Sequence, residues 1–205
     1  MKVGIIGEGD TEFYCIPTLV SKKGHQVVGC HNLRGVGGDY PWDSLFTKKI
    51  YPYVRGFAVK SAVNKPDKVL IIIDREDRSE CCGGLAAEGV RLITHKLAEE
   101  NLSIATSVVI PNRQIECWLM ADTSALDRSP LFERPLSPLL GDNLDETNVM
   151  KVINDNLKKG QKWDKPKFGK ALVQKLNLEN ETVLRRSRSL RKLIKEVEQC
   201  EKETE

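Results

Sequence analysis

The sequence predicts an α/β fold with a central four-stranded, mainly parallel sheet, helices on both of its faces and a C-terminal helical segment. Three observations lead to this prediction. The apolar runs at 3–7 and 69–73 show no alternation, as expected for strands buried on both faces. Helical patterns alternate with the strands, which is typical of parallel sheets. A length of 205 residues favours one domain.

The first strand–helix–strand unit occupies the N-terminal part of the chain. The strand at 3–7 (VGIIG) is followed by apolar residues at helical spacing, and Asp10 or Thr11 can cap that helix. Gly24 ends it. The segment HQVVGCHNL at 25–33 then predicts the second strand.

The next unit begins with a glycine-rich loop at 34–41. Residues 42–62 follow a helical pattern, and Pro52 is expected to kink or split the helix because it lacks a backbone N–H. Val69 to Ile73 are continuously apolar and mostly β-branched, which predicts a central parallel strand.

A further helix is expected at 85–101, a fourth strand at 102–111 and a helix at 113–126. Prolines break the pattern at 127–144. We therefore predict an α/β core at 1–126, a connecting loop at 127–144, and a basic helical extension at 145–205 that packs on the core. The helical segments of the extension are expected at 145–158, about 166–177 and 181–199.

Composition and charge narrow the function classes. The chain is 40% hydrophobic and 30% charged, and no apolar run approaches the about 20 residues that span a bilayer. The N-terminus turns acidic at once, unlike a signal peptide, so we expect a cytoplasmic protein with no membrane partner. Residues 158–195 hold thirteen Lys and Arg against three acidic residues. Such a basic segment fits polyanion binding, and it equally fits ordinary solvated helix faces.

Acidic residues follow three of the four predicted strands, where ligands of open parallel sheets bind. Carboxylates gathered at one sheet edge repel one another unless a cation lies among them. Mg²⁺ and Mn²⁺ prefer oxygen ligands, and one or two such ions can hold a phosphodiester for in-line attack. The candidate metal ligands are Glu8, Glu12, Asp74, Glu76 and Glu116.

Helix capping is the alternative explanation for some of these acids. Asp10 and Glu116 lie in first turns of predicted helices, where carboxylates are favoured anyway. Glu8 and Asp74 directly follow apolar strands, where no helix dipole stabilises a carboxylate. The chain contains no GxxxxGK[ST] motif, and its first strand–helix turn, GEGDTE, lacks the dinucleotide-binding glycines.

The motifs EGDTE after the first strand and DRE after the third resemble the TOPRIM domain of topoisomerases, primases and OLD-type nucleases. NRQIECWLMAD, WDKPKFGKAL and RRSRSLRKLI follow in that order, so the chain resembles a small stand-alone TOPRIM-like family akin to RloB and abortive-infection proteins. The resemblance implies acid–base and metal roles for Glu8, and metal binding by Asp74 with Glu76. Glu76 departs from the family's DxD pattern, and Glu12 matches the second glutamate of EGxxE.

The resemblance also implies a role for the basic extension. Lys165 is the expected catalytic lysine, which balances charge on the scissile phosphate. The side chains expected to contact nucleic-acid phosphates are Lys167, Lys170, Arg185, Arg188 and Arg191.

The leading hypothesis is a Mg²⁺- or Mn²⁺-dependent nuclease acting on DNA or RNA in phage defence or abortive infection. The alternative is a catalytically quiet subunit that binds nucleic acid or a nucleotide for an ABC-type ATPase partner. A third possibility is an interaction protein whose basic helices dock a protein partner. Whether the chain forms a homodimer is open.

Overall fold

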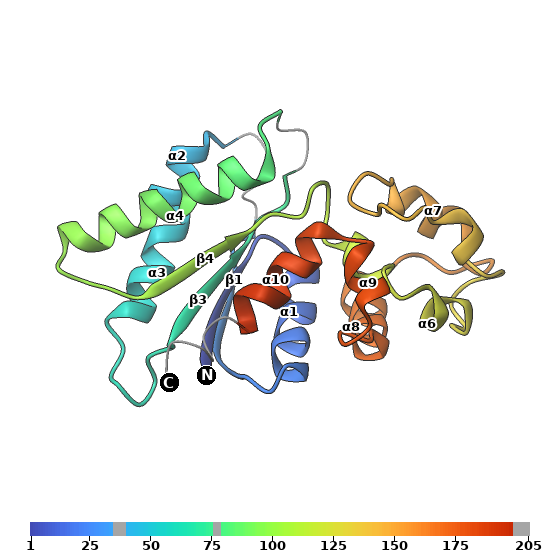
Figure 1. The fold of residues 1–205 in the computed structure, drawn as a ribbon, viewed down its shortest axis with the longest axis horizontal. Coiled ribbons are helices and arrows are strands. Elements are labelled where there is room, and N and C mark those ends of the chain that lie inside the picture. The colour runs from blue at the N-terminus through green and yellow to red at the C-terminus, as the bar shows by residue number, and fades with distance from the viewer. Residues whose placement is uncertain (35–39, 76–78, 199–205) are drawn as a thin grey trace.

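The computed structural model describes residues 1–34, 40–75 and 79–198. Its centre is a parallel sheet in the order β2-β1-β3-β4 (Figure 1). The predicted α/β class with four parallel strands is therefore confirmed. The strands are β1 (Lys2–Gly7), β2 (Gln26–Asn32), β3 (Lys68–Ile72) and β4 (Ala105–Val109).

The register aligns the carboxyl ends of the strands. Gly7 pairs with Asn32 on one side and with Ile72 on the other, and Ile72 pairs with Val109. All four strands therefore end at one edge, and the residues that follow them meet there.

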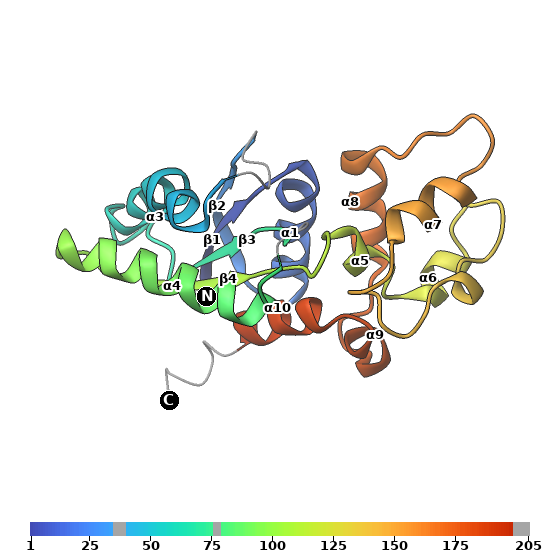
Figure 2. The same ribbon diagram turned by 90° about the horizontal axis from the view of Figure 1, so that it is seen from above.

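Helices cover both faces of the sheet, as Figure 2 shows. One face packs against α2 (Trp42–Ser44), η1 (Leu45–Ile50), α3 (Tyr51–Ala58) and α4 (Cys82–Glu99). The other packs against α1 (Asp10–Lys22) and α10 (Arg188–Glu198). Short helices complete the remainder: α5 (Glu116–Leu119), α6 (Thr123–Asp127), η2 (Ser137–Leu139), α7 (Val149–Asn156), α8 (Lys165–Lys175) and α9 (Glu181–Arg185).

Three expected helices differ from the sequence pattern. The segment expected at 42–62 is divided into α2, the π-helical η1 and α3, and Pro52 lies in the first turn of α3, where a residue without a backbone N–H is tolerated. The helix expected at 113–126 is two short helices, and Asp122 caps the second by accepting from Ala125 N. The last helix is divided at Ser187, whose hydroxyl accepts from Leu190 N.

The C-terminal helices share one core with the α1 face of the sheet. Leu190 and Leu193 of α10 and Leu172 of α8 belong to the same buried cluster as Ile5 and Ile72. Trp118 is fully buried, and its Nε1 donates to Ser189 Oγ at 2.7 Å. In the described ranges, no helix is both long enough and apolar enough to cross a membrane.

Candidate functional site

Glu8 and Asp74 meet at the carboxyl edge of the sheet. Each lies just beyond its strand, β1 or β3, and these strands are hydrogen-bonded neighbours. The backbone N–H of Asp74 donates to Glu8 Oε2 at 3.0 Å. Two acids 66 residues apart in the sequence are therefore in direct contact.

Glu12 lies in the first turn of α1 and points back toward the end of β1. Its Oε2 accepts from Gly9 N at 2.9 Å, and its side chain is buried. Gly7 makes this packing possible, because a Cβ there would lie 2.4 Å from Glu12 Cβ. Burial raises the pKa of Glu12 to about 7; the neighbouring Glu116 adds to the rise, while backbone hydrogen bonds and Lys165 oppose it.

Glu116 is the first residue of α5 and has no exposed surface. Its Oε1 accepts from Thr11 Oγ1 at 3.1 Å and lies 3.1 Å from Lys165 Nζ. Its Oε2 is buried, and no hydrogen-bond partner for it occurs among the described residues. A buried carboxylate oxygen without a hydrogen bond lowers the stability of the fold unless another group, such as a cation, contacts it.

The same acids shift the pKa of Asp74. Burial raises its pKa well above the ordinary value, and Glu12, Glu116 and Glu8 raise it further. Lys165 is the cation that opposes these effects. The carboxylates of Glu8, Glu12, Asp74 and Glu116 form what we call the carboxylate cluster.

Lys165 reaches the carboxylate cluster from α8, far along the chain. Asp164 caps α8 by accepting from Lys167 N at 2.9 Å, so the helix starts at Lys165. Lys165 Nζ lies beside Glu116 of the cluster. Gly169 lets α8 approach α1, since a Cβ there would lie 3.0 Å from Cys15 Sγ. Burial lowers the pKa of Lys165, but Glu116, with Glu12 and Asp74, more than offsets this and leaves it raised.

The predicted phosphate-binding residues lie on α8, α9 and α10. Glu76 falls outside the described residues. Lys167 and Lys170 are exposed on α8, and in the described part of the chain neither forms an ion pair. Arg185 pairs with Glu181 at 3.3 Å, and Arg191 is exposed on α10.

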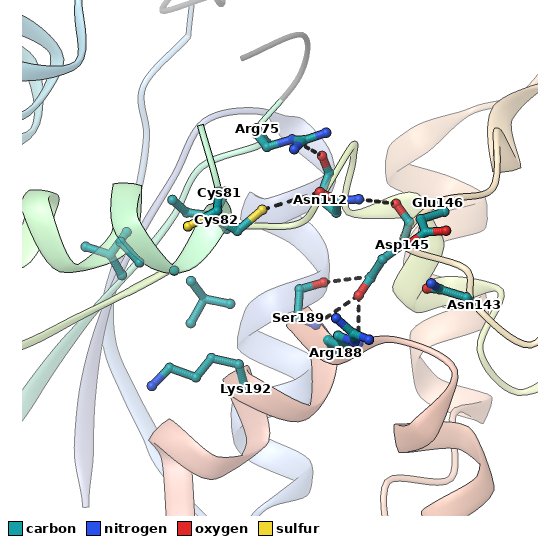
Figure 3. A pocket seen from close by; sticks show the side chains of 15 residues that line it. Arg75, Cys81, Cys82, Asn112, Asn143, Asp145, Glu146, Arg188, Ser189 and Lys192 are labelled. Carbon is teal, nitrogen blue, oxygen red and sulfur yellow. Dashed lines mark hydrogen bonds between the residues drawn. The ribbon is translucent and has the colours of Figure 1, made fainter. Parts of the chain in front are cut away.

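Arg188 lines a separate cavity of about 570 Å³ beside the edge strand β4 (Figure 3). The described residues of the lining do not include Glu8, Glu12, Asp74 or Glu116. Its side chains include Arg75, whose Nε donates to Asn112 O at 2.9 Å, and Lys192. The cavity therefore contains basic groups, and it is separate from the carboxylate cluster.

Sequence patterns gave no signal for two residues that organise these sites. Thr11 looks like a cap residue, yet its hydroxyl holds Glu116. Asp145 is buried, accepts from Ser187 Oγ and Ser189 Oγ, and fixes the start of α10 by accepting from Arg188 N at 2.7 Å. Both contacts join segments that are distant in the sequence.

Whether the protein can bind a metal ion depends on the carboxylate cluster. Within residues 1–34, 40–75 and 79–198, no three His, Cys, Asp or Glu side chains are arranged as ligands of one ion. Mg²⁺ commonly uses only one or two carboxylates, with water and substrate phosphate completing its shell. Burial and the neighbouring acids raise the pKa of Asp74, and no described residue donates to Glu116 Oε2, so the donor set is compatible with such an ion.

No protein-family model and no curated protein matches the sequence. Among solved structures, the chain is similar to the C-terminal region of the Xanthomonas campestris pv. campestris OLD protein. The structure phased with mercury has 14% identity and a TM-score of 0.43, over 95% of each chain. The one phased with platinum has 15% identity and a TM-score of 0.42, over 99% of this chain and 97% of that one. Similarity at this level does not identify a family or a function.

Proposed function

We propose that the chain is a metal-dependent nuclease that hydrolyses a phosphodiester bond of DNA or RNA at the carboxylate cluster. The observation that carries the proposal is the meeting of four acids from three separate segments with one lysine, Lys165. Asp74, Glu12, Glu8 and Glu116 would supply the one or two carboxylates that hold each Mg²⁺ or Mn²⁺, with water and substrate phosphate completing its shell. When bound, the ion polarises the phosphate and lowers the pKa of a water molecule.

The chain's own groups have distinct tasks in this reaction. Water attacks phosphorus, one ester P–O bond breaks, and the leaving oxygen takes up a proton. Glu8, which lies between the ends of β1 and β3, is the group assigned to move protons. Lys165 is half exposed, so its ammonium can contact the phosphate and balance its growing negative charge.

Metal-dependent cleavage by neutralised variants tests the proposal. Asp74→Asn and Glu8→Gln keep the size of the side chain but remove its charge. Each is expected to lower the cleavage rate of labelled oligonucleotides by at least about 10²–10³-fold, the size of a lost electrostatic contact to a transition state. Asp155→Asn, an exposed acid on α7, is the matched control. Full activity in Asp74→Asn rejects the proposal.

A second candidate function is supported by one contact. Lys165 already lies 3.1 Å from Glu116, so part of the charge that a metal would supply is present in the protein. On this basis the domain binds nucleic acid or a nucleotide without cleaving it. Calorimetry with Mn²⁺ separates the two functions: millimolar or tighter binding that Asp74→Asn removes favours the nuclease, and no binding favours the quiet module.

A further inference from the structure

A second basic hollow lies beside the carboxylate cluster, at the carboxyl end of β2. It has a volume of about 460 Å³. We call it the β2 hollow; its lining includes Asn32, Arg34, Lys48, Lys49, Pro52 and Tyr53. None of the described residues that line it is acidic.

The β2 hollow adjoins the carboxylate cluster through the first turn of α1. Asn32 pairs with Gly7, the residue before Glu8, and Leu33 N donates to Gly7 O at 2.9 Å. Asp10 Oδ1 accepts from Asn32 Nδ2 at 2.8 Å and lies 3.4 Å from an Arg34 nitrogen. The hollow therefore begins one strand away from Glu8, on the opposite side of β1 from β3.

The charges of the β2 hollow are available to a ligand. Lys48 and Lys49 are exposed at the end of η1, and in the described ranges neither forms an ion pair. Lys49 Nζ lies 5.0 Å from the Tyr40 ring centroid, a contact that leaves its charge unneutralised. The Arg34 side chain is 78% exposed despite its pairing with Asp10. Three cations around one concavity favour a polyanion.

Tyr53 adds an aromatic surface to these cations. It is 37% exposed, and the remainder of the ring packs near His31, with centroids 4.9 Å apart. Sites that combine a basic groove with an exposed aromatic ring are typical of single-stranded nucleic acid, because any base can stack on the ring. A base within a duplex must first leave its stack, which costs free energy.

We propose that the β2 hollow binds one unpaired nucleotide of a single-stranded nucleic acid, with the base on Tyr53 and phosphates near Lys48, Lys49 and Arg34. This inference rests on the proposed function for the identity of the substrate. It adds that the substrate is single-stranded at this point, and that the strand runs from the carboxylate cluster across the first turn of α1.

Binding is measured by fluorescence anisotropy with fluorescein-labelled 12-nucleotide DNA and RNA, single-stranded and duplex, in EDTA so that no metal-dependent cleavage occurs. The variants are Lys48→Gln with Lys49→Gln, and Tyr53→Leu. The control is Arg128→Gln with Lys151→Gln, exposed basic residues at the end of α6 and on α7, two helices on the far side of the molecule (Figure 2).

The two variants are expected to fail in different ways. The double lysine variant lowers single-strand affinity about tenfold and reduces the salt dependence by about 1.4, the slope of two lost phosphate contacts. Tyr53→Leu lowers affinity about 5- to 150-fold with an unchanged salt slope, because stacking is not an ionic contact. The control keeps wild-type affinity.

Wild-type affinity in the double lysine variant overturns the inference, and so does duplex binding as tight as single-strand binding. These outcomes are separate from those for the proposed function. If the hollow variants lose binding while no metal supports cleavage, the nuclease fails and the nucleotide site stands. If Asp74→Asn abolishes cleavage while the hollow variants bind normally, the nucleotide site fails and the nuclease stands.

Discussion

Two clusters of buried charge in the described part of the chain are built in opposite ways. In the first, Glu196 of α10 accepts from Lys68 Nζ at 2.7 Å, from Ser107 Oγ and from Lys192 Nζ. In the carboxylate cluster, four acids share one half-exposed lysine. Among the described residues, two lysines pair with the one acid of the first cluster, whereas one lysine lies among the four acids of the second.

The pKa values follow this difference. Burial alone raises the pKa of a carboxyl, but hydrogen bonds from Lys192, Lys68 and Ser107 bring the pKa of Glu196 down to about 2. In the carboxylate cluster, burial and like charges act together and raise the pKa of Glu12 to about 7. The Glu196 cluster ties α10 to the sheet. The carboxylate cluster instead has raised pKa values at Glu12 and Asp74, and perturbed values of this kind are typical of functional sites.

The largest expected effect on stability comes from breaking the neutralised cluster. Lys68→Met leaves Glu196 buried with one of its two lysines, and we expect a loss of about 3 kcal/mol in the free energy of unfolding. Urea unfolding at pH 7 measures it. Lys195→Met, an exposed lysine of α10, is the control and should change stability by less than about 0.5 kcal/mol. A loss below 1 kcal/mol in Lys68→Met would contradict the assignment of this cluster to stability.

Removing a negative charge from the carboxylate cluster should increase the free energy of unfolding, in contrast to Lys68→Met. With a folded pKa of about 7 against an ordinary 4.5, Glu12 stays protonated in the folded protein while it ionises in the unfolded chain. As pH rises from about 4.5 to 7, this difference therefore lowers the free energy of unfolding by up to about 3 kcal/mol. Above that pH the loss stays constant. Glu12→Gln removes this loss, so the metal-free variant should be more stable than wild type at pH 8.

Urea unfolding in EDTA at pH 5 and pH 8 tests this. The difference between Glu12→Gln and wild type should be larger at pH 8, and Glu80→Gln, an exposed acid, should show no such difference. Equal stability of Glu12→Gln and wild type at both pH values would show that Glu12 is already neutralised.

The smallest effect concerns the approach of α8, which supplies Lys165. Gly169→Ala places a Cβ 3.0 Å from Cys15 Sγ, and overpacking should exceed the gain in helix propensity by about 1 kcal/mol. Because α8 shifts away from α1, cleavage should fall as well. Gly56→Ala in α3 is the matched control: nothing lies within 4 Å of its added Cβ, so it should be slightly stabilising. Thermal unfolding and cleavage rates measure both variants.

Local patterns in the sequence were sufficient for the sheet and for part of the site. Continuous apolar runs predicted buried parallel strands, and parallel strands must bring their carboxyl ends to one edge. Glu8 and Asp74 directly follow two such strands, so their meeting could be predicted without knowing any long-range contact. The prediction that Lys165 belongs with them came from the resemblance, not from a pattern in the residues themselves.

The tertiary structure alone decided the rest. Helix patterns did not show the breaks at Asp122 and Ser187, because these depend on hydrogen bonds of polar side chains to backbone N–H groups. Charge counts did not separate Arg188, which lines the cavity beside β4, from Lys165, which contacts Glu116. The β2 hollow gathers residues from β2 and η1 that no spacing connects.

The physical reason is the range of the interactions. Hydrophobic periodicity and strand ends are properties of neighbouring residues, and the sequence by itself determined them. Which buried acid receives a lysine, and which is left with an unpartnered oxygen, depends on how α1, α5, α8 and α10 pack. That packing is fixed by contacts between residues far apart in the sequence, such as Lys68 with Glu196 at 128 positions and Lys23 with Glu179 at 156, and only the folded chain shows it.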